Sequence, residues 1–158
     1  MFHVAERVGH YHVEPYREWH YLEATKGLYA WQDAHKTARL YGDRGPAWTL
    51  FLGDQILATA GVVVIHPGLG EAWAVLTDAG RAHPLRVVRA IARRLTAIIE
   101  AERLRRCQAH VVQAHAPAVR LLLLLGFAVE TPLRAYGPNG EDFLMMVRYP
   151  PAPEVPRG

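Results

Sequence analysis

One segment of the sequence, residues 71–127, limits the fold more than any other part of the chain. Its middle predicts a long amphipathic helix, because apolar residues recur there at intervals of three and four. The apolar residues are Val88, Ile91, Ala92, Leu95, Ile98 and Ile99, and Arg86, Arg89 and Arg93 follow another face. Residues 71–77 and 107–113, on either side of the helix, suit strands. A strand, a helix and a strand in this order predict a crossover between two parallel strands of one sheet.

The chain before this segment predicts one strand and two helices. Residues 2–8 suit a strand, and Pro15 suits the first turn of a helix that Gly27 interrupts. A second helix is expected over residues 28–40, and Gly42 is expected to end it.

A meander of three antiparallel strands is expected next. The strands are residues 47–52, 55–65 and 71–77, and Gly53-Asp54 forms the first tight turn.

After the crossover the sequence predicts a short helix and a hairpin. Pro117 opens a helix over residues 118–125, and Gly126 ends it in a left-handed conformation. Residues 128–136 and 142–149 form the hairpin. The whole pattern predicts an α+β fold with a mixed, mostly antiparallel sheet, one parallel crossover and helices on both faces.

Length and composition indicate a globular protein of the cytoplasm. We expect a single domain over residues 1–149 of the 158, followed by a proline-rich tail at residues 150–158. The longest aliphatic run, residues 121–125, is too short to span a membrane, and the first residues lack the pattern of a secretion signal. The single cysteine, Cys107, excludes an internal disulfide and fits a reducing compartment.

Basic residues gather in one part of the chain. Residues 81–106 contain eight arginines, although the formal net charge of the whole chain is only +3. The arginines suit a solvated helix face with local ion pairs, and they also suit a local anion site. Nucleic-acid binding through this face is the weakest of the functions considered, because the overall charge is modest.

The order of elements resembles the GNAT (GCN5-related N-acetyltransferase) superfamily. The clearest marks are residues 72–77, which read AWAVLT, residues 119–127, which end in Gly126-Phe127, and the turn at residues 136–140. Within the superfamily these residues look most like diverged phage proteins of the T7 internal virion protein type. The resemblance implies a homodimer formed through sheet edges or C-terminal strands.

The resemblance also implies a place for acetyl-CoA. Two parallel strands would separate, the backbone of Ala74, Val75 and Leu76 would contact the pantetheine, and the pyrophosphate would lie at the start of the long helix. Active members have Gln/Arg-x-x-Gly-x-Gly/Ala there. The matching run begins with Arg81 but places Pro84 and Arg86 at the glycine positions. Arg81, His83 and Arg86 would then hold the phosphates by charge, and the alternative is a plain helix start with Asp78 as its cap.

The catalytic residues implied by the resemblance are Glu71 and His115. Glu71 would be the general base for the acceptor amine, or else a solvent-facing carboxylate beside a turn. His66 is a second candidate base. His115 stands where many members have an asparagine, so it would bond the pantetheine, act as an acid, or only begin the helix. The tyrosine that often protonates the departing thiolate is replaced by Leu122.

The remaining candidate side chains give weaker indications of a function. Trp73 and Trp48 are candidate walls of an acceptor pocket or ordinary core residues. Cys107 has no activating partner in the sequence, and the histidines lack the spacing of a metal site, so no metal is expected.

Two functions remain open on these grounds. The first is an acyl-CoA-dependent N-acyltransferase that moves an acetyl group to a primary amine of a small molecule or a protein. The second is a catalytically degenerate GNAT-fold phage protein with a structural or assembly role among virion proteins. The expected location is the cytoplasm, or the host cytoplasm and the virion if a phage encodes the chain.

Overall fold

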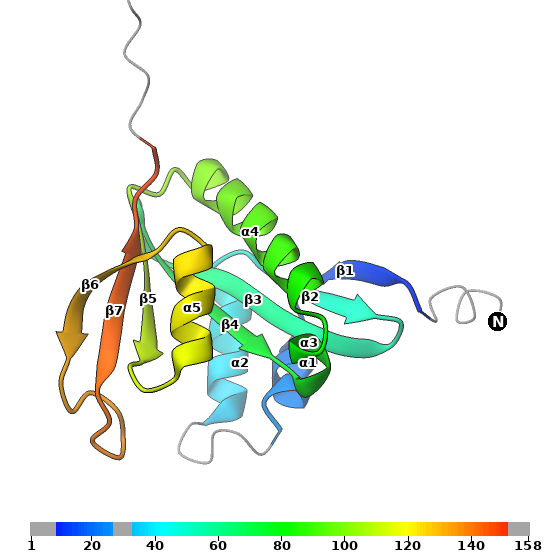
Figure 1. Cartoon of the computed structure of the whole chain (residues 1–158). Coiled ribbons are helices and arrows are strands. Elements are labelled where there is room, and N and C mark those ends of the chain that lie inside the picture. Colours follow the sequence, from blue (N-terminus) through cyan, green and yellow to red (C-terminus); the bar gives the residue numbers. More distant parts are fainter. Residues whose placement is uncertain (1–8, 27–32, 152–158) are drawn as a thin grey trace, which may run out of the picture.

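The computed structural model describes residues 9–26 and 33–151, in which a seven-stranded sheet has helices on both faces (Figure 1). The strands are β1 (Tyr11–Pro15), β2 (Ala47–Leu52), β3 (Gln55–His66), β4 (Leu69–Leu76), β5 (Arg106–Val112), β6 (Ala128–Leu133) and β7 (Phe143–Arg148). The helices are α1 (Glu18–Ala24), α2 (Ala34–Asp43), α3 (Asp78–Arg81), α4 (Pro84–Ala101) and α5 (Ala116–Leu124).

The sheet order β1-β2-β3-β4-β5-β7-β6 confirms the predicted α+β fold and its crossover. Among the described strands, only β4 and β5 pair in parallel, and α3 and α4 connect them. Within the described residues, no helix is both long and apolar enough to cross a membrane.

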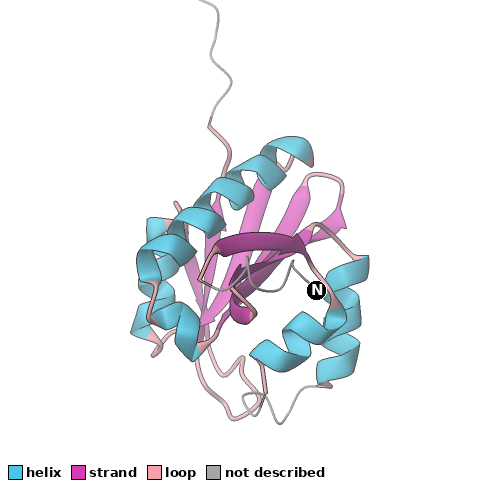
Figure 2. Ribbon diagram, turned by 90° about the vertical axis from the view of Figure 1, so that its right-hand side faces the viewer, coloured by secondary structure: helices cyan, strands magenta, loops and turns pink. Residues whose placement is uncertain are grey.

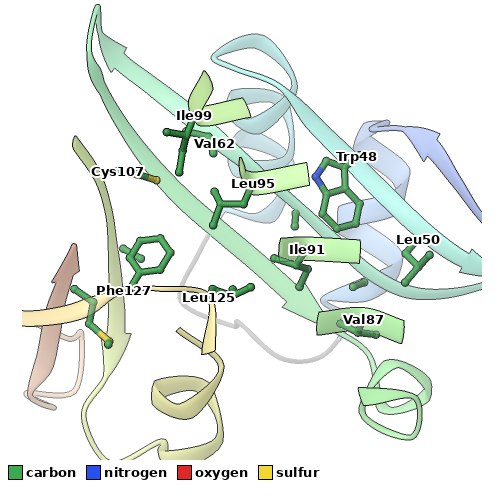
Figure 3. Close-up of a cluster of buried hydrophobic side chains, with 14 of the residues drawn as sticks. Trp48, Leu50, Val62, Val87, Ile91, Leu95, Ile99, Cys107, Leu125 and Phe127 are labelled. Carbon is green, nitrogen blue, oxygen red and sulfur yellow. The ribbon is translucent and has the colours of Figure 1, made fainter. Parts of the chain in front are cut away.

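Helix α4 packs on the sheet along a single buried stripe (Figure 3). The stripe consists of Val87, Ile91, Leu95 and Ile99, one residue per turn. Val88 was expected in this stripe, but it is only partly buried, whereas Val87 is fully buried. A residue one position away points about 100° around the helix, so the true stripe begins at Val87.

The two faces of the sheet carry different hydrophobic clusters, and Figure 2 shows helices on either side of the strands. On the α4 and α5 side, the cluster is large and includes Trp48, Val62 and Phe127. On the α1 and α2 side, a smaller cluster includes Tyr21, Phe51 and Val75. Because alternate residues of a strand point to opposite faces, the central strands β2, β3 and β4 contribute to both clusters.

The N-terminal part of the chain differs from its prediction. Pro15 does not open a helix: it is the last residue of β1, and α1 begins at Glu18. Proline fits there because β1 is an edge strand that pairs only with β2. The strand expected at residues 2–8 lies outside the described residues.

The boundaries of helix α2 also differ. Its described part begins after Asp33, whose side chain accepts a hydrogen bond from the Lys36 amide at 3.2 Å. The expected start at residue 28 lies outside the described residues. Gly42 does not end the helix, which continues to Asp43.

The C-terminal elements follow the prediction closely. Pro117 lies in the first turn of α5, and Gly126 has a φ of 88° just after it, which confirms the left-handed helix stop. Strands β6 and β7 form the hairpin, but β6 ends at Leu133, three residues before the expected end. Of the tail, residues 152–158 lie outside the described residues.

Candidate active site

Strands β4 and β5 are paired at one end and separate at the other. Their parallel ladder joins Leu69 to Arg106, Gly70 to Cys107 and Glu71 to Gln108, and no pair follows. Strand β4 nevertheless continues to Leu76 and β5 to Val112. The strands therefore diverge just beyond Glu71 and Gln108, as in the arrangement that the resemblance implied.

A cavity of about 140 Å³ lies at this divergence, and we call it the gap cavity. Ala72 and Ala74 of β4 line one side and Ala109 of β5 lines another, so small side chains leave the space open. Helices α4 and α5 contribute Ile91, Leu95, Ile98, Leu121, Leu122 and Leu125. No described side chain fills the gap, and its lining on the α4 and α5 side is apolar.

The gap cavity also reaches residues of the opposite sheet face. Ala72 packs with the α4 and α5 cluster, whereas Trp73 packs with the α1 and α2 cluster. By the same alternation, Ala109 faces α4 and His110 faces the α1 and α2 side. Trp73 of β4 and His110 of β5 also line the cavity, which therefore extends to the place where the two strands separate.

The side chains of Glu71 and His110 contact each other across the point where the strands separate. The contact joins His110 Nδ1 and Glu71 Oε1, and both side chains are partly exposed. Glu71 is therefore not an isolated carboxylate beside a turn. His110 was not identified from the sequence, although the alternation of buried and polar residues in β5 was a usable signal.

Aromatic rings surround this pair on the α1 and α2 side. The ring of Tyr136 stacks on His110 with centroids 5.3 Å apart, and Phe143 contacts Tyr136. Tyr41 stacks on Trp73 at 3.9 Å between centroids. Trp73 Nε1 is buried and has no hydrogen-bond partner among the described residues. A buried donor of this kind is suited to a ligand acceptor.

The basic residues at the start of α4 are placed by Tyr11 of β1. Tyr11 Oη and His83 Nδ1 are hydrogen-bonded at 2.9 Å, and the Arg86 guanidinium lies 4.5 Å from the centre of the Tyr11 ring. Arg81 pairs with Asp78 at 2.7 Å on the surface. Asp78 is therefore not the cap of α4, as had been considered. The N-cap is His83, whose side chain makes no capping bond.

In the segment between β4 and α4, Gly80 allows close packing against β3. A Cβ atom at Gly80 would lie 2.0 Å from the carbonyl oxygen of Leu57, so α3 packs directly on β3. Thr77 caps this short helix by accepting from the Gly80 amide at 3.1 Å. Helix α3 was not predicted, because four residues are too few to show a helical period.

The second predicted catalytic residue, His115, is not near Glu71 along the gap. His115 is the exposed N-cap of α5 and its side chain makes no capping bond. It follows the far end of β5, and the strand from Gln108 to Val112 alone spans about 13 Å. Leu122, at the position of the expected tyrosine, lines the gap cavity.

The other candidates are structural or exposed. Cys107 is 1% exposed, and burial raises the pKa of its thiol to about 11, so it is a poor nucleophile. Trp48 of β2 belongs to the core and also lines the gap cavity. His66 is exposed at the end of β3, and its Nδ1 lies 3.0 Å from the Pro67 carbonyl oxygen.

Comparison with known proteins gives structural relatives only. No protein-family model matches the sequence, and no curated protein sequence matches it. Among solved structures, an acetyltransferase of the GNAT family from Streptococcus pneumoniae matches with a TM-score of 0.68 and 13% identity, covering 89% of this chain and 99% of that one. The chain has the GNAT fold.

Other GNAT-fold structures align over nearly the same length. Ribosomal-protein-S5-alanine acetyltransferase from Vibrio fischeri has a TM-score of 0.70 and 16% identity, covering 89% of this chain and 93% of that one. The yncA acetyltransferase from Salmonella typhimurium, solved with its cofactor acetyl-CoA, has a TM-score of 0.70 and 14% identity, covering 92% and 98%. At such identities the likeness concerns the fold, and function has to be argued from the site.

Proposed function

We propose that this protein is an acyl-CoA-dependent N-acyltransferase that moves an acetyl group to a primary amine. The observation that carries the proposal is the end of the β4–β5 ladder at Glu71, with an open cavity beyond it. A sheet that paired β4 and β5 along their whole length would have no room for a ligand between them.

The residues along the gap fit the pantetheine arm of acetyl-CoA. Beyond Glu71, the backbone groups of Ala74, Val75 and Leu76 on the β5 side have no strand to pair with. An extended amide-containing chain satisfies such groups in the way a strand does. The apolar lining from α4 and α5 suits the methylene groups of the same arm.

The start of α4 fits the pyrophosphate through charge more than through backbone amides. Arg81 and Arg86 are exposed there, and His83 lies between them in the chain. Pro84 contributes no amide donor, but the positive end of an 18-residue helix favours an anion. Acetyl-CoA bound in this way would supply a thioester that an amine can attack.

The catalytic groups of this proposal are those on the α1 and α2 face. The pair formed by Glu71 and His110 would accept the proton of the amine, and the aromatic rings of Trp73 and Tyr136 would flank the acceptor. His115 would contact the pantetheine from the start of α5. An amine acceptor agrees with the name of the ribosomal-protein-S5-alanine acetyltransferase whose fold this chain shares.

Isothermal titration of the full chain with acetyl-CoA tests the binding step. We expect a one-to-one isotherm with a Kd below about 0.1 mM, which corresponds to at least about 5.5 kcal/mol. Desulfo-CoA and free acetate serve as the positive and negative control ligands. If acetyl-CoA in the millimolar range gives only the heat of dilution, the protein does not bind acyl-CoA and the proposal is wrong.

A catalytically degenerate, phage-type structural protein is the second candidate, favoured by Leu122 and Pro84 at positions where active members have a tyrosine and a glycine. The turn at residues 136–140 also looks like that of the phage proteins. This candidate expects no acetyl-CoA binding and a stable association with virion proteins. A free species in lysates of infected cells, with acetyl-CoA bound, would count against it.

A further inference from the structure

His110 holds a distinct place in the gap cavity. Among the described residues that line the cavity, it is the only titratable one, because the others are aliphatic, glycine, phenylalanine or tryptophan. Glu71 is not part of this lining, but its carboxylate contacts His110, which is. Among the described lining residues, His110 is therefore the candidate for moving a proton at this cavity.

The contacts of His110 leave one ring nitrogen available. Nδ1 contacts the Glu71 carboxylate, which can only accept a hydrogen bond when ionised, so Nδ1 carries the proton. In the neutral ring, Nε2 then carries a lone pair. Within residues 9–26 and 33–151, the polar contact shown for the His110 ring is the one from Nδ1 to Glu71, and the side chain is 22% exposed. Tyr136 stacks on the ring face and limits its rotation.

We propose that His110 is the proton shuttle of the acyl transfer and that Glu71 is its positioning residue. This inference rests on the proposed acyltransferase function. His110 Nε2 takes a proton from the amine nitrogen as the C–N bond to the acyl carbon forms. It gives the same proton to the sulfur as the C–S bond breaks. The products are the N-acyl amine and the free thiol, and His110 ends in its starting state.

A shuttle of this kind accounts for Leu122. A separate phenol is needed only when the base cannot reach the departing sulfur. Both the nitrogen and the sulfur are attached to one carbon during the transfer, so one imidazole can serve both, as the histidine of a serine protease does. Glu71 would hold the ring orientation and stabilise the imidazolium that forms transiently.

Kinetics of three variants separate these roles. His110→Asn should lower kcat for release of the CoA thiol from acetyl-CoA by about 100-fold to 1000-fold, with water or phenethylamine as acceptor. Its Kd for acetyl-CoA should stay within about twofold of wild type, because the loss is confined to the transition state. Glu71→Gln should lower kcat by about tenfold, because glutamine still accepts from Nδ1 but carries no charge. His35→Asn, an exposed histidine on α2, is the matched control.

Chemical rescue and nuclear magnetic resonance give readouts that would not change if His110 had only a structural role. Added imidazole should restore part of the kcat of His110→Ala and should not change the Glu71→Gln variant. In the unliganded wild-type protein, ¹⁵N spectra should show the neutral His110 ring protonated at Nδ1. Glu71→Ala should shift the ring toward the Nε2-protonated form.

The outcomes separate this inference from the proposed function. If acetyl-CoA does not bind to wild type, both fail. If acetyl-CoA binds but no thiol is released with any acceptor, both fail as well. If wild type releases the thiol and His110→Asn keeps kcat within about threefold of wild type, only the shuttle is overturned. A wild-type ring protonated at Nε2 would also overturn it, even with acyl transfer intact.

Discussion

The two faces of the sheet differ most where β4 and β5 separate. On the α4 and α5 face, the gap cavity is lined by alanine, leucine and isoleucine side chains. On the α1 and α2 face, the same gap carries the Glu71–His110 pair and a group of stacked aromatic rings. One face can bury an apolar chain, and the other can move a proton. The strand alternation of β4 and β5 assigns each task to its own face.

Filling the apolar face should have the largest effect. Ala74 is exposed at the edge of the gap cavity, so Ala74→Trp would occupy ligand space with little overpacking of the core. We expect the Kd for acetyl-CoA to rise by about 10-fold to 100-fold in isothermal titration. The matched control is Ala128→Trp on edge strand β6. Equal binding by Ala74→Trp and wild type would mean that the ligand does not use the gap.

Removing charge at the start of α4 should have a smaller effect that depends on the ligand. Arg86→Ala should weaken acetyl-CoA binding about threefold to tenfold, because an exposed cation contributes about 1 kcal/mol to a phosphate contact. S-acetylpantetheine, which lacks the pyrophosphate, should bind both proteins equally. Arg89→Ala, an exposed arginine of the same helix, is the control. Equal weakening of both ligands would place the phosphates elsewhere.

The smallest expected effect concerns stability on the α1 and α2 face. His20 is 0% exposed, and its Nδ1 is hydrogen-bonded to Thr49 Oγ1 at 2.8 Å and to the Arg17 amide at 3.1 Å. Burial lowers the pKa of His20 below its ordinary value of 6.5. The unfolded chain therefore binds a proton below about pH 6.5 that the folded chain resists, so stability falls as the pH drops through that region.

Urea unfolding at about pH 7.5 and about pH 5.5 measures this loss. His20→Asn keeps an acceptor near the position of Nδ1 but cannot be protonated, so its stability should change less between the two conditions. The His35→Asn variant should behave as wild type. If the free energy of unfolding of His20→Asn falls between the two pH values as much as that of wild type, other groups cause the pH dependence.

The sheet and its crossover could be predicted from the sequence because they follow from the spacing of apolar residues and from the residue types at the turns. The apolar stripe of the long helix, the lengths of the strands and the helix stop at Gly126 are patterns of neighbouring residues. Such patterns predict secondary structure without knowledge of the tertiary contacts. Pro15 was misplaced because proline suits both a helix start and an edge strand, and only the sheet order decides between them.

The site was harder to predict than the fold because it depends on contacts between distant residues. Glu71 was identified by its place in a strand, but its partner His110 lies 39 positions away and meets it only through the parallel register. Likewise, no local pattern indicates that Tyr11 would meet His83 and Arg86. Leu122 at the position of the family's tyrosine was visible in the sequence, whereas His110, which we propose takes over that role, was not identified from it.

The central claim is that the β4–β5 gap holds an acyl-CoA molecule with its thioester beside His110. A crystal structure of the full chain grown with saturating acetyl-CoA tests it most directly. We expect the pantetheine between Ala74 and Ala109 and the thioester within hydrogen-bonding range of His110 Nε2. A structure in which the gap is closed by side chains, or in which acetyl-CoA binds away from it, would contradict the account.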